Sequence, residues 1–448
     1  MRELHLGNGS KVAVIGGGPA GSFFSYFLLQ LAQRLDLNLQ VDIYEPRDYT
    51  VPGPQGCNMC AGIISESLVQ LLATEGINLP SIIVQRGIEN YVLYTSKGKT
   101  RIRTATDEQR IAAVFRGAGP RDLTESTWRS FDGYLLELAV SKGALHKQEK
   151  AKGVRWNQGG VELSTSGGNS QVYDLAVVAA GLNSSTLKIF DGLGLKYKPP
   201  QSIRSHLREY KLGKEKVEKY LGVNVHVFLL NLPGLEFGAI VPKGSYATLC
   251  LVGYGVDDNL VKSFLSHPLV KGCLPPDTKP EGSCRCFPPA YFRAAIEPFA
   301  DRIVFIGDSG ASRLFKDGIG AAYRTSKAAA TTAILQGVSA NDFRRHYFPI
   351  CKRIESDNQI GRVVFAVNSA IKKRSYALGG LVRMVNREQQ DARARKRMSG
   401  VVWDTFTGSA PYKDIFKRTL HPLFVMRYLS DIAAEVWPIR RRRQRSLT

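Results

Sequence analysis

The sequence predicts an α/β protein with a parallel sheet built from two distant parts of the chain, an inserted, mainly antiparallel sheet and a C-terminal helical region. Three observations predict this fold. A short β-branched run leads through glycines into an apolar helix near the N-terminus, a second strand–turn–helix pattern follows nearly three hundred residues later, and short strands punctuated by Gly, Pro and Asn lie between them. The length of 448 residues allows two or three packed regions.

Composition excludes several classes of protein. With 44% hydrophobic and 22% charged residues, the chain is neither collagen-like, disordered nor a small disulfide-stapled domain. Its formal net charge is +22, and residues 341–448 alone hold 23 Lys and Arg against nine Asp and Glu, a net charge of +14. A field of that sign attracts nucleic acid, anionic lipid headgroups or acidic substrates.

The cysteine usage and the first residues predict a cytoplasmic protein. Seven cysteines, an odd number, are scattered along the chain, and residues 1–10 contain no apolar targeting core. No uninterrupted apolar stretch approaches the ~18–20 residues needed to cross a bilayer. We therefore expect reduced thiols and no membrane span, with the option of peripheral attachment to the inner face of the membrane.

The first strand–turn–helix unit predicts a dinucleotide site. Lys11–Ile15 (KVAVI) is typical of a buried parallel strand, GGGPAG follows, and SFFSYFLLQLAQRL predicts a helix. In this context one glycine allows the tight turn, one lets the backbone approach a pyrophosphate and one lets the helix pack on the strand, while the helix N-terminus offers N–H groups to phosphate. The residues expected to contact the cofactor here are Gly16, Gly18, Pro19, Ala20 and Gly21.

The next strand supports the same site. Leu39–Tyr44 (LQVDIY) ends at Glu45, 24 residues beyond Gly21. An acid at this place can accept hydrogen bonds from a ribose diol. A glycine-rich turn alone is weak evidence, but the turn with both strands, the helix and the acid is strong evidence.

A second unit lies far downstream. Arg302–Ile306 (RIVFI) predicts a strand ending at Gly307 and Asp308, and a helix of small residues is expected from about Ala321. The Asp308 carboxylate can hydrogen-bond a sugar-like hydroxyl. The turn of Gly318, Ile319 and Gly320 opens a helix N-terminus, which can stabilise negative charge such as that of a reduced flavin.

The pair of motifs resembles the FAD-dependent oxidoreductase superfamily that includes aromatic hydroxylases, halogenases and geranylgeranyl reductases. The resemblance covers roughly Lys11–Leu335 and implies a Rossmann-like FAD-binding fold of the glutathione-reductase type, with FAD as cofactor. Trp128–Leu135 (WRSFDGYL) resembles the "R..FD..L" helix start, which implies that Arg129 approaches the flavin. Tyr173–Ser184 resembles another family strand and implies a cofactor contact at Gly181; Ala180 replaces the Asp usual in hydroxylases, which weakens hydroxylase-style NADPH docking.

One segment points to a branch of the superfamily. Gly56–Ser65 (GCNMCAGIIS) resembles the "CGG" segment of geranylgeranyl reductases, with Cys60 as the matching Cys and Ala61 in place of a Gly. Phe237–Gly244 loosely matches a strand of that branch, and the "WxWxIP" of tryptophan halogenases is absent. The resemblance implies that Cys60 lies beside the flavin ring and shapes the substrate pocket, which makes it the candidate catalytic residue.

The cysteine spacing by itself leaves three interpretations. Cys57 and Cys60 form a CxxC, and Cys284 and Cys286 form a CxC. Four sulfurs could bind zinc, and a CxxC could be a redox dithiol. Small buried side chains are the favoured interpretation, so no metal is expected. The histidines at 146, 206, 226 and 346 show no ligand spacing.

The predicted organisation has four parts. Residues 1–198 form the first part of the FAD-binding domain, with a β-hairpin excursion near 83–118, and residues 296–340 form its second part. Residues 199–295 form an antiparallel substrate-binding sheet, which suits a lipophilic ligand but suits an ordinary core equally well. Residues 341–448 form a basic helical region whose aromatic and cationic residues, with the Arg440–Arg443 quartet, predict contact with an anionic membrane surface. A solvated basic tail is the alternative, and nucleic acid is less favoured because no reader motif is present.

These patterns predict a reductase that transfers hydride from reduced FAD to a carbon–carbon double bond of an isoprenoid or other lipophilic substrate, with NAD(P)H or ferredoxin as electron donor. One alternative is an FAD-dependent monooxygenase or halogenase that acts on an apolar or aromatic substrate. Another is a non-catalytic flavin-binding protein that docks on membranes or nucleic acid.

Overall fold

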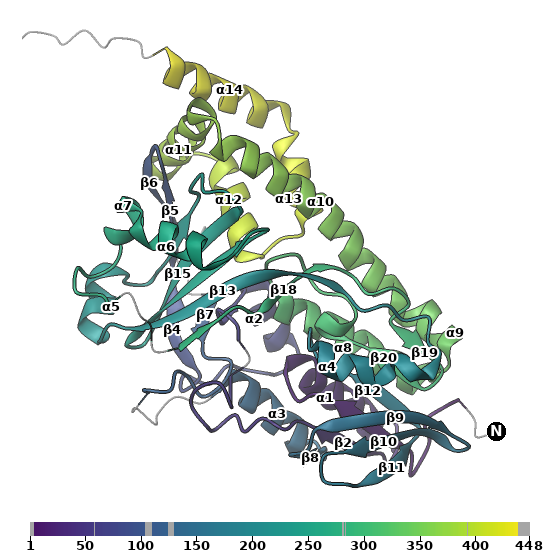
Figure 1. The fold of residues 1–448 in the computed structure, drawn as a ribbon. Coiled ribbons are helices and arrows are strands. Elements are labelled where there is room, and N and C mark those ends of the chain that lie inside the picture. The colour runs from purple at the N-terminus through teal and green to yellow at the C-terminus, as the bar shows by residue number, and fades with distance from the viewer. Residues whose placement is uncertain are drawn as a thin grey trace, which may run out of the picture.

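The computed structural model describes residues 4–57, 59–103, 110–123, 130–279, 282, 284–391 and 393–437. It confirms the predicted α/β fold with its C-terminal helical region (Figure 1). Within the described residues, no helix combines the length and apolarity that a bilayer crossing requires.

A six-stranded sheet lies at the centre of the nucleotide-type half, and β1 and β2 occupy the positions that the sequence predicts. Its central strands are parallel and buried on both faces, which explains their continuous apolar runs. In order across the sheet the strands are β19 (Phe299–Ala300), β20 (Ile303–Phe305), β12 (Leu175–Val178), β1 (Lys11–Ile15), β2 (Gln40–Tyr44) and β8 (Leu145–Lys147). Strands from residue 11 and residue 303 therefore belong to one sheet.

Helices cover one face of this sheet and a small sheet covers the other. α1 (Pro19–Arg34), α3 (Phe131–Ser141) and α8 (Gly318–Leu335) share a core with the first face. α1 and α8 approach closely, because Ser326 Oγ donates to the Ala20 carbonyl at 2.7 Å and Tyr323 packs edge-on against Phe23 and Phe27. The opposite face carries β9 (Ala151–Asn157), β10 (Gly160–Thr165) and β11 (Ser170–Tyr173).

The second large sheet has eight strands and stands beside the first half (Figure 1). The β5–β6 hairpin joins it because β5 pairs in parallel with β14. In order the strands are β17 (Cys284–Cys286), β13 (Gln201–Lys211), β16 (Tyr246–Gly253), β15 (Leu235–Lys243), β14 (Asn224–Phe228), β5 (Asn90–Thr95) and β6 (Gly98–Arg103), with β18 (Pro289–Arg293) paired to β13. A three-stranded sheet of β3 (Ile63–Ile64), β7 (Ile111–Val114) and β4 (Val84–Ile88) lies between the halves.

Helices cover both faces of the second sheet. α10 (Phe348–Lys372), α11 (Ser375–Gln390), α12 (Arg397–Thr407), α13 (Tyr412–Thr419) and α14 (Pro422–Val436) supply side chains to its core on one face. α5 (Lys214–Tyr220), α6 (Asp258–Ser266) and α7 (Pro268–Lys271) lie on the other. The remaining helices are α2 (Glu66–Thr74), α4 (Ser184–Leu187) and α9 (Ala340–Asp342), with 3₁₀ turns at Lys188–Leu193 and Gly307–Ser309 and a π-helical turn at Phe343–Tyr347.

Candidate functional site

The first glycine turn joins β1 to α1 and leaves no room for a side chain at position 16 or 21. Gly16 has φ +110°, and a Cβ there would lie 2.4 Å from the Ala179 carbonyl oxygen. A Cβ on Gly21 would lie 1.9 Å from the Gly16 carbonyl oxygen. Gly18 is the N-cap of α1, followed by Pro19 and Ala20, and no described side chain caps the helix. Its first N–H groups are therefore available to a phosphate.

Glu45 lies beside this turn. It follows directly after β2 and is only 3% exposed. Its Oε2 accepts hydrogen bonds from the Gly17 N–H at 3.0 Å and the Tyr49 hydroxyl at 3.1 Å, and its Oε1 accepts from the Arg47 N–H at 2.9 Å. These bonds fix the carboxylate at the mouth of the glycine turn, where a ribose would follow a pyrophosphate.

The second turn begins where β20 ends. The Gly307 N–H donates to Thr325 Oγ1 of α8 at 3.0 Å, and Asp308 follows. Burial raises the pKa of Asp308, while a hydrogen bond from Ser312 and the charge of Arg116 act in the opposite direction. A Cβ on Gly318 would lie 3.8 Å from Asp308 Oδ1, so the carboxyl group and the start of α8 are neighbours.

The helix expected from about Ala321 begins three residues earlier. Gly318, Ile319 and Gly320 form the first turn of α8 instead of a turn before it. The N-cap is Asp317 in the left-handed region (φ +54°), and its carboxylate accepts from Ser65 Oγ at 2.7 Å and Arg324 Nη1 at 3.1 Å. A Cβ on Gly320 would lie 2.3 Å from that carboxylate, which explains the glycine there.

Two further residues are predicted to contact the cofactor, Gly181 and Arg129. Gly181, at φ +62°, follows β12, and its carbonyl oxygen accepts from Ser309 Oγ at 2.9 Å. This bond ties the loop after β12 to the second turn, and a Cβ on Gly181 would meet no described atom within 4 Å. Arg129 lies outside the described residues.

Sequence reasoning missed a buried ion pair between the two halves. Arg116 follows β7, and its Nη2 donates to Asp132 Oδ2 of α3 at 2.7 Å, with a second bond from Nε to Oδ1. Burial alone would lower the pKa of Arg116, but the Asp132 carboxylate outweighs burial and raises it. Tyr49 and Cys60 also act on this pKa, so Arg116 connects the Glu45 region to the Cys60 segment. The signal for this ion pair in the sequence was an Arg at position 116, fifteen residues before the Phe131–Asp132 pair.

Cys60 lies between the nucleotide-type half and the second sheet. Its Sγ accepts from the Gly62 N–H at 3.4 Å, and its charge influences the pKa of both Arg116 and Cys250. All seven cysteines are free thiols, and no metal-binding cluster of Cys, His, Asp or Glu exists within the described part of the chain. Burial raises the pKa of Cys57, and that of Cys286 to about 12, which favours neutral thiols over reactive thiolates there.

Two lysines that sequence reasoning also missed, the buried Lys243 and the partly exposed Lys316, complete the region. Lys243 of β15 lies 3.7 Å from Glu209 Oε1 and 4.9 Å from the centre of the Phe115 ring. Lys316 lies on the loop between Asp308 and α8. Neither lysine belongs to a recognisable sequence motif, so only the fold shows that they lie in the same region.

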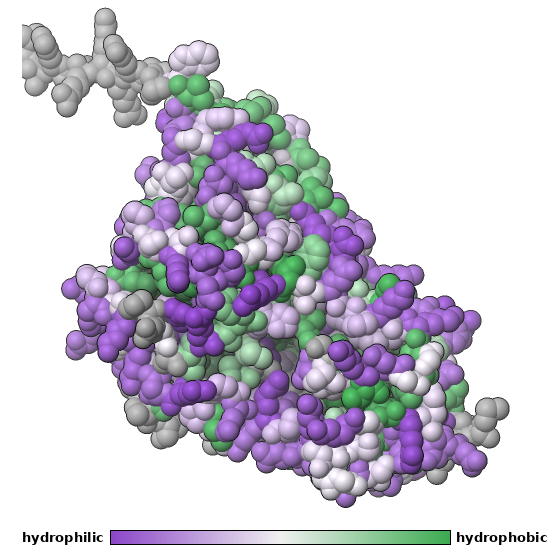
Figure 2. All heavy atoms as spheres, in the orientation of Figure 1, coloured by the Kyte–Doolittle hydropathy of each residue, from purple (hydrophilic) through white to green (hydrophobic). Residues whose placement is uncertain are grey.

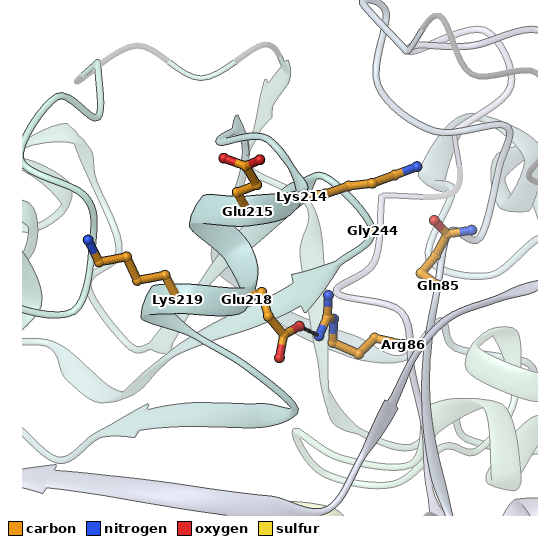
Figure 3. Close-up of a pocket in the computed structure, with 7 residues that line it drawn as sticks. All are labelled: Gln85, Arg86, Lys214, Glu215, Glu218, Lys219 and Gly244. Carbon is orange, nitrogen blue, oxygen red and sulfur yellow. Dashed lines mark hydrogen bonds and ion pairs between the residues drawn. The ribbon is translucent and has the colours of Figure 1, made fainter.

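The hollows on the surface lie away from the predicted cofactor residues. A hollow of about 730 Å³ opens between β4 and α5 and is lined by Gln85, Arg86, Lys214, Glu215, Glu218, Lys219 and Gly244 (Figure 3). Arg86 Nη1 pairs with Glu218 Oε2 there at 2.7 Å, while Lys214 and Lys219 point in opposite directions. None of the predicted cofactor residues lines this hollow, or a second one bordered by Glu236 and Arg362.

Comparison with known proteins shows the fold. No protein-family model and no curated protein matches the chain. A mutant of the halogenase PltM in complex with FAD matches with TM-score 0.60 and 12% identity, covering 96% of this chain and 97% of that one. A mutant of Klebsiella pneumoniae HpxO complexed with FAD matches with TM-score 0.56 and 15% identity, covering 90% and 99%.

An oxygenase of 2-methyl-3-hydroxypyridine-5-carboxylic acid, also a mutant, matches with TM-score 0.59 and 15% identity, covering 82% of this chain and 94% of that one. At such identities the likeness is one of fold. The architecture is that of the Rossmann-type flavoproteins, and the likeness in fold covers between 82% and 96% of this chain.

Proposed function

We propose that this protein is an FAD-dependent oxidoreductase. The observation that carries the proposal is the meeting of two glycine turns, one at residues 16–21 and one at 307–320. They follow β1 and β20, which lie on either side of β12 in one sheet, and they lead into the adjoining helices α1 and α8. Two distant sequence segments that build one cradle suit a long, two-part cofactor such as FAD. The full-length matches to FAD-bound halogenase and HpxO structures support the same cofactor.

The residues present fit FAD. The turn of Gly16–Gly21 and the uncapped start of α1 would hold the pyrophosphate, Glu45 the adenosine ribose and Asp308 the hydroxyls of the ribityl chain. The start of α8 would face the flavin ring with its positive dipole end. When bound, FAD supplies two-electron redox chemistry.

The chain itself contributes position, charge and exclusion of water. Arg116 is held by Asp132 within electrostatic reach of Asp308 and Cys60, so it places a fixed positive charge along the cradle. The rings of Phe237 and Phe406 pack edge-to-face in the core between the second sheet and α12. Lys316, on the loop that carries Asp308, lies 4.4 Å from the centre of the Phe237 ring, so this apolar core borders the loop, and such surroundings suit an apolar substrate.

For the reaction class, we infer monooxygenation or halogenation of an apolar or aromatic substrate. The structural neighbours named above are a halogenase and an oxygenase, and HpxO belongs to the same fold group. A second candidate is reduction of a carbon–carbon double bond by NAD(P)H- or ferredoxin-derived electrons. It is favoured by the Cys60 segment, which lies beside Arg116 and Cys250.

The experiment has two stages. Purified protein should carry yellow, protein-bound FAD that is released on unfolding, and a colourless folded protein that takes up no added FAD would overturn the proposal. Reduced protein is then mixed with apolar extracts under ¹⁸O₂ or under nitrogen. A product with one ¹⁸O, or a halogenated product when halide is supplied, supports the first candidate. A product that gains two hydrogens without oxygen supports the second.

A flavin-binding protein without turnover is the remaining alternative. It would keep FAD, but neither condition would give a product, and the flavin would be reoxidised only at the rate of free FAD.

A further inference from the structure

Lys316 is a partly exposed cation that lies against aromatic rings. It immediately precedes Asp317, the N-cap of α8, on the loop that carries Asp308. Its Nζ lies 4.4 Å from the centre of the Phe237 ring of β15 and 5.8 Å from that of Phe406 of α12. The ammonium group therefore projects into the space between the second sheet and the C-terminal helices.

The side chain of Lys316 differs in its partners from the buried lysines Lys243 and Lys372. Lys372 Nζ donates to the carbonyl oxygens of Leu235 at 2.6 Å and Glu236 at 2.8 Å, and Lys243 has Glu209 within 3.7 Å. Among the described residues, the Nζ of Lys316 has no hydrogen bond and no carboxylate partner. A partly buried ammonium group without an anionic partner gains from pairing with one, so such a site suits an anion from outside the chain.

The surroundings of Lys316 leave its ammonium group largely protonated at neutral pH. β15 presents Phe237 and α12 presents Phe406, and neither titrates. β16 presents Cys250, whose thiol pKa burial raises to about 11, so this neighbour is neutral at physiological pH. Burial lowers the pKa of Lys316 to about 8, and the lysine is still mostly protonated at neutral pH.

We propose that Lys316 binds an anionic oxygen of the substrate, a carboxylate or a phenolate. The proposal rests on the proposed function, because the loop that holds Lys316 leads into the helix start expected to face the flavin ring. Cation–π contacts with the two rings are worth roughly 0.5–2 kcal/mol. A carboxylate or phenolate oxygen would add an ion pair that the described residues do not give to Lys316.

The test uses matched ligand pairs on the FAD-loaded protein. Calorimetry compares 2-naphthoate, 4-phenylphenolate and hexadecanoate with their amide or methyl-ether analogues, in wild type, Lys316→Met and Lys316→Arg. At about pH 7 we expect at least one acid to bind wild type about tenfold more tightly than its neutral analogue. The preference should weaken above pH about 8, vanish in Lys316→Met and persist to higher pH in Lys316→Arg. Lys262→Met, at an exposed position of α6, is the matched control and should behave as wild type.

Two results would overturn the proposal: no acid preference in wild type for any pair, or the same preference in Lys316→Met. FAD content, measured by absorbance in each variant, separates this outcome from failure of the proposed function. If wild type holds no FAD, the proposed function fails, whereas a preference lost in a Lys316→Met protein that keeps its FAD supports Lys316 as the anion-binding residue.

A second, independent observation concerns the outer face of the C-terminal helices. α14 buries only Phe424 and Asp431 and exposes large apolar side chains, with Met426 64% and Trp437 80% exposed. Figure 2 shows hydrophobic residues at the end of the molecule where α14 lies. We call the following residues the α14 surface: Leu420, Leu423, Val425, Met426, Leu429, Val436 and Trp437.

Exposed cations lie on α13 and α14, the helices that carry or precede the α14 surface. Lys413, Lys417 and Arg427 are exposed, and the whole 341–448 region carries a net charge of +14. Apolar side chains flanked by cations match the boundary between acyl chains and anionic headgroups. We infer that the α14 surface docks on an anionic lipid membrane.

Sedimentation with vesicles tests this inference. Wild type should sediment with phosphatidylglycerol vesicles and much less with phosphatidylcholine vesicles, and binding should fall as salt rises. The double variant Met426→Glu/Leu429→Glu should reduce sedimentation at least tenfold, whereas Leu145→Glu, at an exposed apolar position on β8, should not. Failure of wild type to bind, or a double variant that binds normally, would overturn the inference. The inference would also be overturned if wild type self-associated and the double variant were monomeric.

Discussion

The 1.9 Å between the Gly16 carbonyl oxygen and the place of a Cβ on Gly21 shows how tightly α1 sits on β1. No real Cβ approaches an oxygen so closely, so any side chain at position 21 must displace either the turn or the helix. The glycines thus fix the geometry of the pyrophosphate site before any ligand binds.

Gly21→Ala should therefore weaken both the fold and FAD binding. Overpacking of this kind costs about 1–3 kcal/mol, and the displaced turn no longer presents its N–H groups. We expect a lower urea midpoint and a loss of bound FAD on gel filtration. Gly7→Ala is the control because its Cβ meets no atom within 4 Å. Wild-type FAD content in Gly21→Ala would contradict the assigned role.

The Arg116–Asp132 pair gives a second prediction at this scale. Asp132→Ala leaves the Arg116 guanidinium buried without its carboxylate, and breaking such a pair typically costs about 3–5 kcal/mol. Urea unfolding should show this loss. The exposed Lys216–Asp277 pair serves as control, and Asp277→Ala should leave the midpoint unchanged within error. An equally small effect of Asp132→Ala would mean that water reaches Arg116.

At the residue scale, the sequence predicts the geometry of residues that lie close to one another along the chain. Gly16, Gly21 and Glu45 lie on one local strand–turn–helix–strand unit, whose spacing determines their geometry. Arg116 and Lys316 acquire their roles from contacts with Asp132 and Phe406, which lie on other elements. No local pattern distinguishes such residues from the other cations of a basic chain.

At the scale of elements, a glycine pair determines how the C-terminal helices pack. A Cβ on Gly380 of α11 would lie 2.6 Å from Ile432 Cγ1, and one on Gly379 would lie 2.6 Å from the Glu435 carboxyl carbon. α11 and α14 therefore approach within a distance that only glycine allows. The apolar side chains on the opposite side of α14 stay outside this contact.

Gly380→Val should separate α14 from α11. The branched side chain would collide with Ile432, so we expect trypsin to cleave within 413–437 at least about tenfold faster than in wild type. Gly400→Ala in α12 is the control, because its Cβ meets only the end of Arg418 at 3.6 Å. Equal cleavage rates in Gly380→Val and wild type would show that the contact can relax.

The element boundaries also show where prediction from sequence stops. The strand Lys11–Ile15 was predicted with its observed bounds, because the β-branched run ends sharply at glycine. The helix expected from about Ala321 begins at Gly318, since Asp317 adopts a left-handed conformation and its carboxylate is bound by Ser65, a residue 252 positions away. A distant partner, which no local pattern contains, thus sets the start of the helix.

At the scale of the whole molecule, two buried histidines link stability to pH. His206 is fully buried, and burial together with Arg208, Arg285 and Arg204 lowers its pKa to about 4. Burial also lowers the pKa of His226 to about 4. Because an unfolded histidine titrates near 6.5, the unfolded chain takes up protons first on acidification. Stability should be complete above about pH 6.5 and fall towards pH 4.

The expected loss is about 3 kcal/mol for each histidine across that range. It can be measured as the difference in urea unfolding free energy between about pH 7 and about pH 4.5. His226→Gln should reduce this difference, whatever its effect at neutral pH, and His346→Gln at an exposed position should not. An identical pH dependence in His226→Gln and wild type would show that His226 is not buried as a neutral ring.

The place of β20 in the central sheet has a consequence for biosynthesis. This strand pairs with β12, and α8 behind it packs on α1, so the cradle lacks one side until about residue 335 has left the ribosome. A nascent chain that carries only the first glycine turn has half of the proposed binding site. Coenzyme loading should therefore be a late event in the life of the polypeptide, close to chain release, and ribosome-stalled chains that end before β20 should emerge without it.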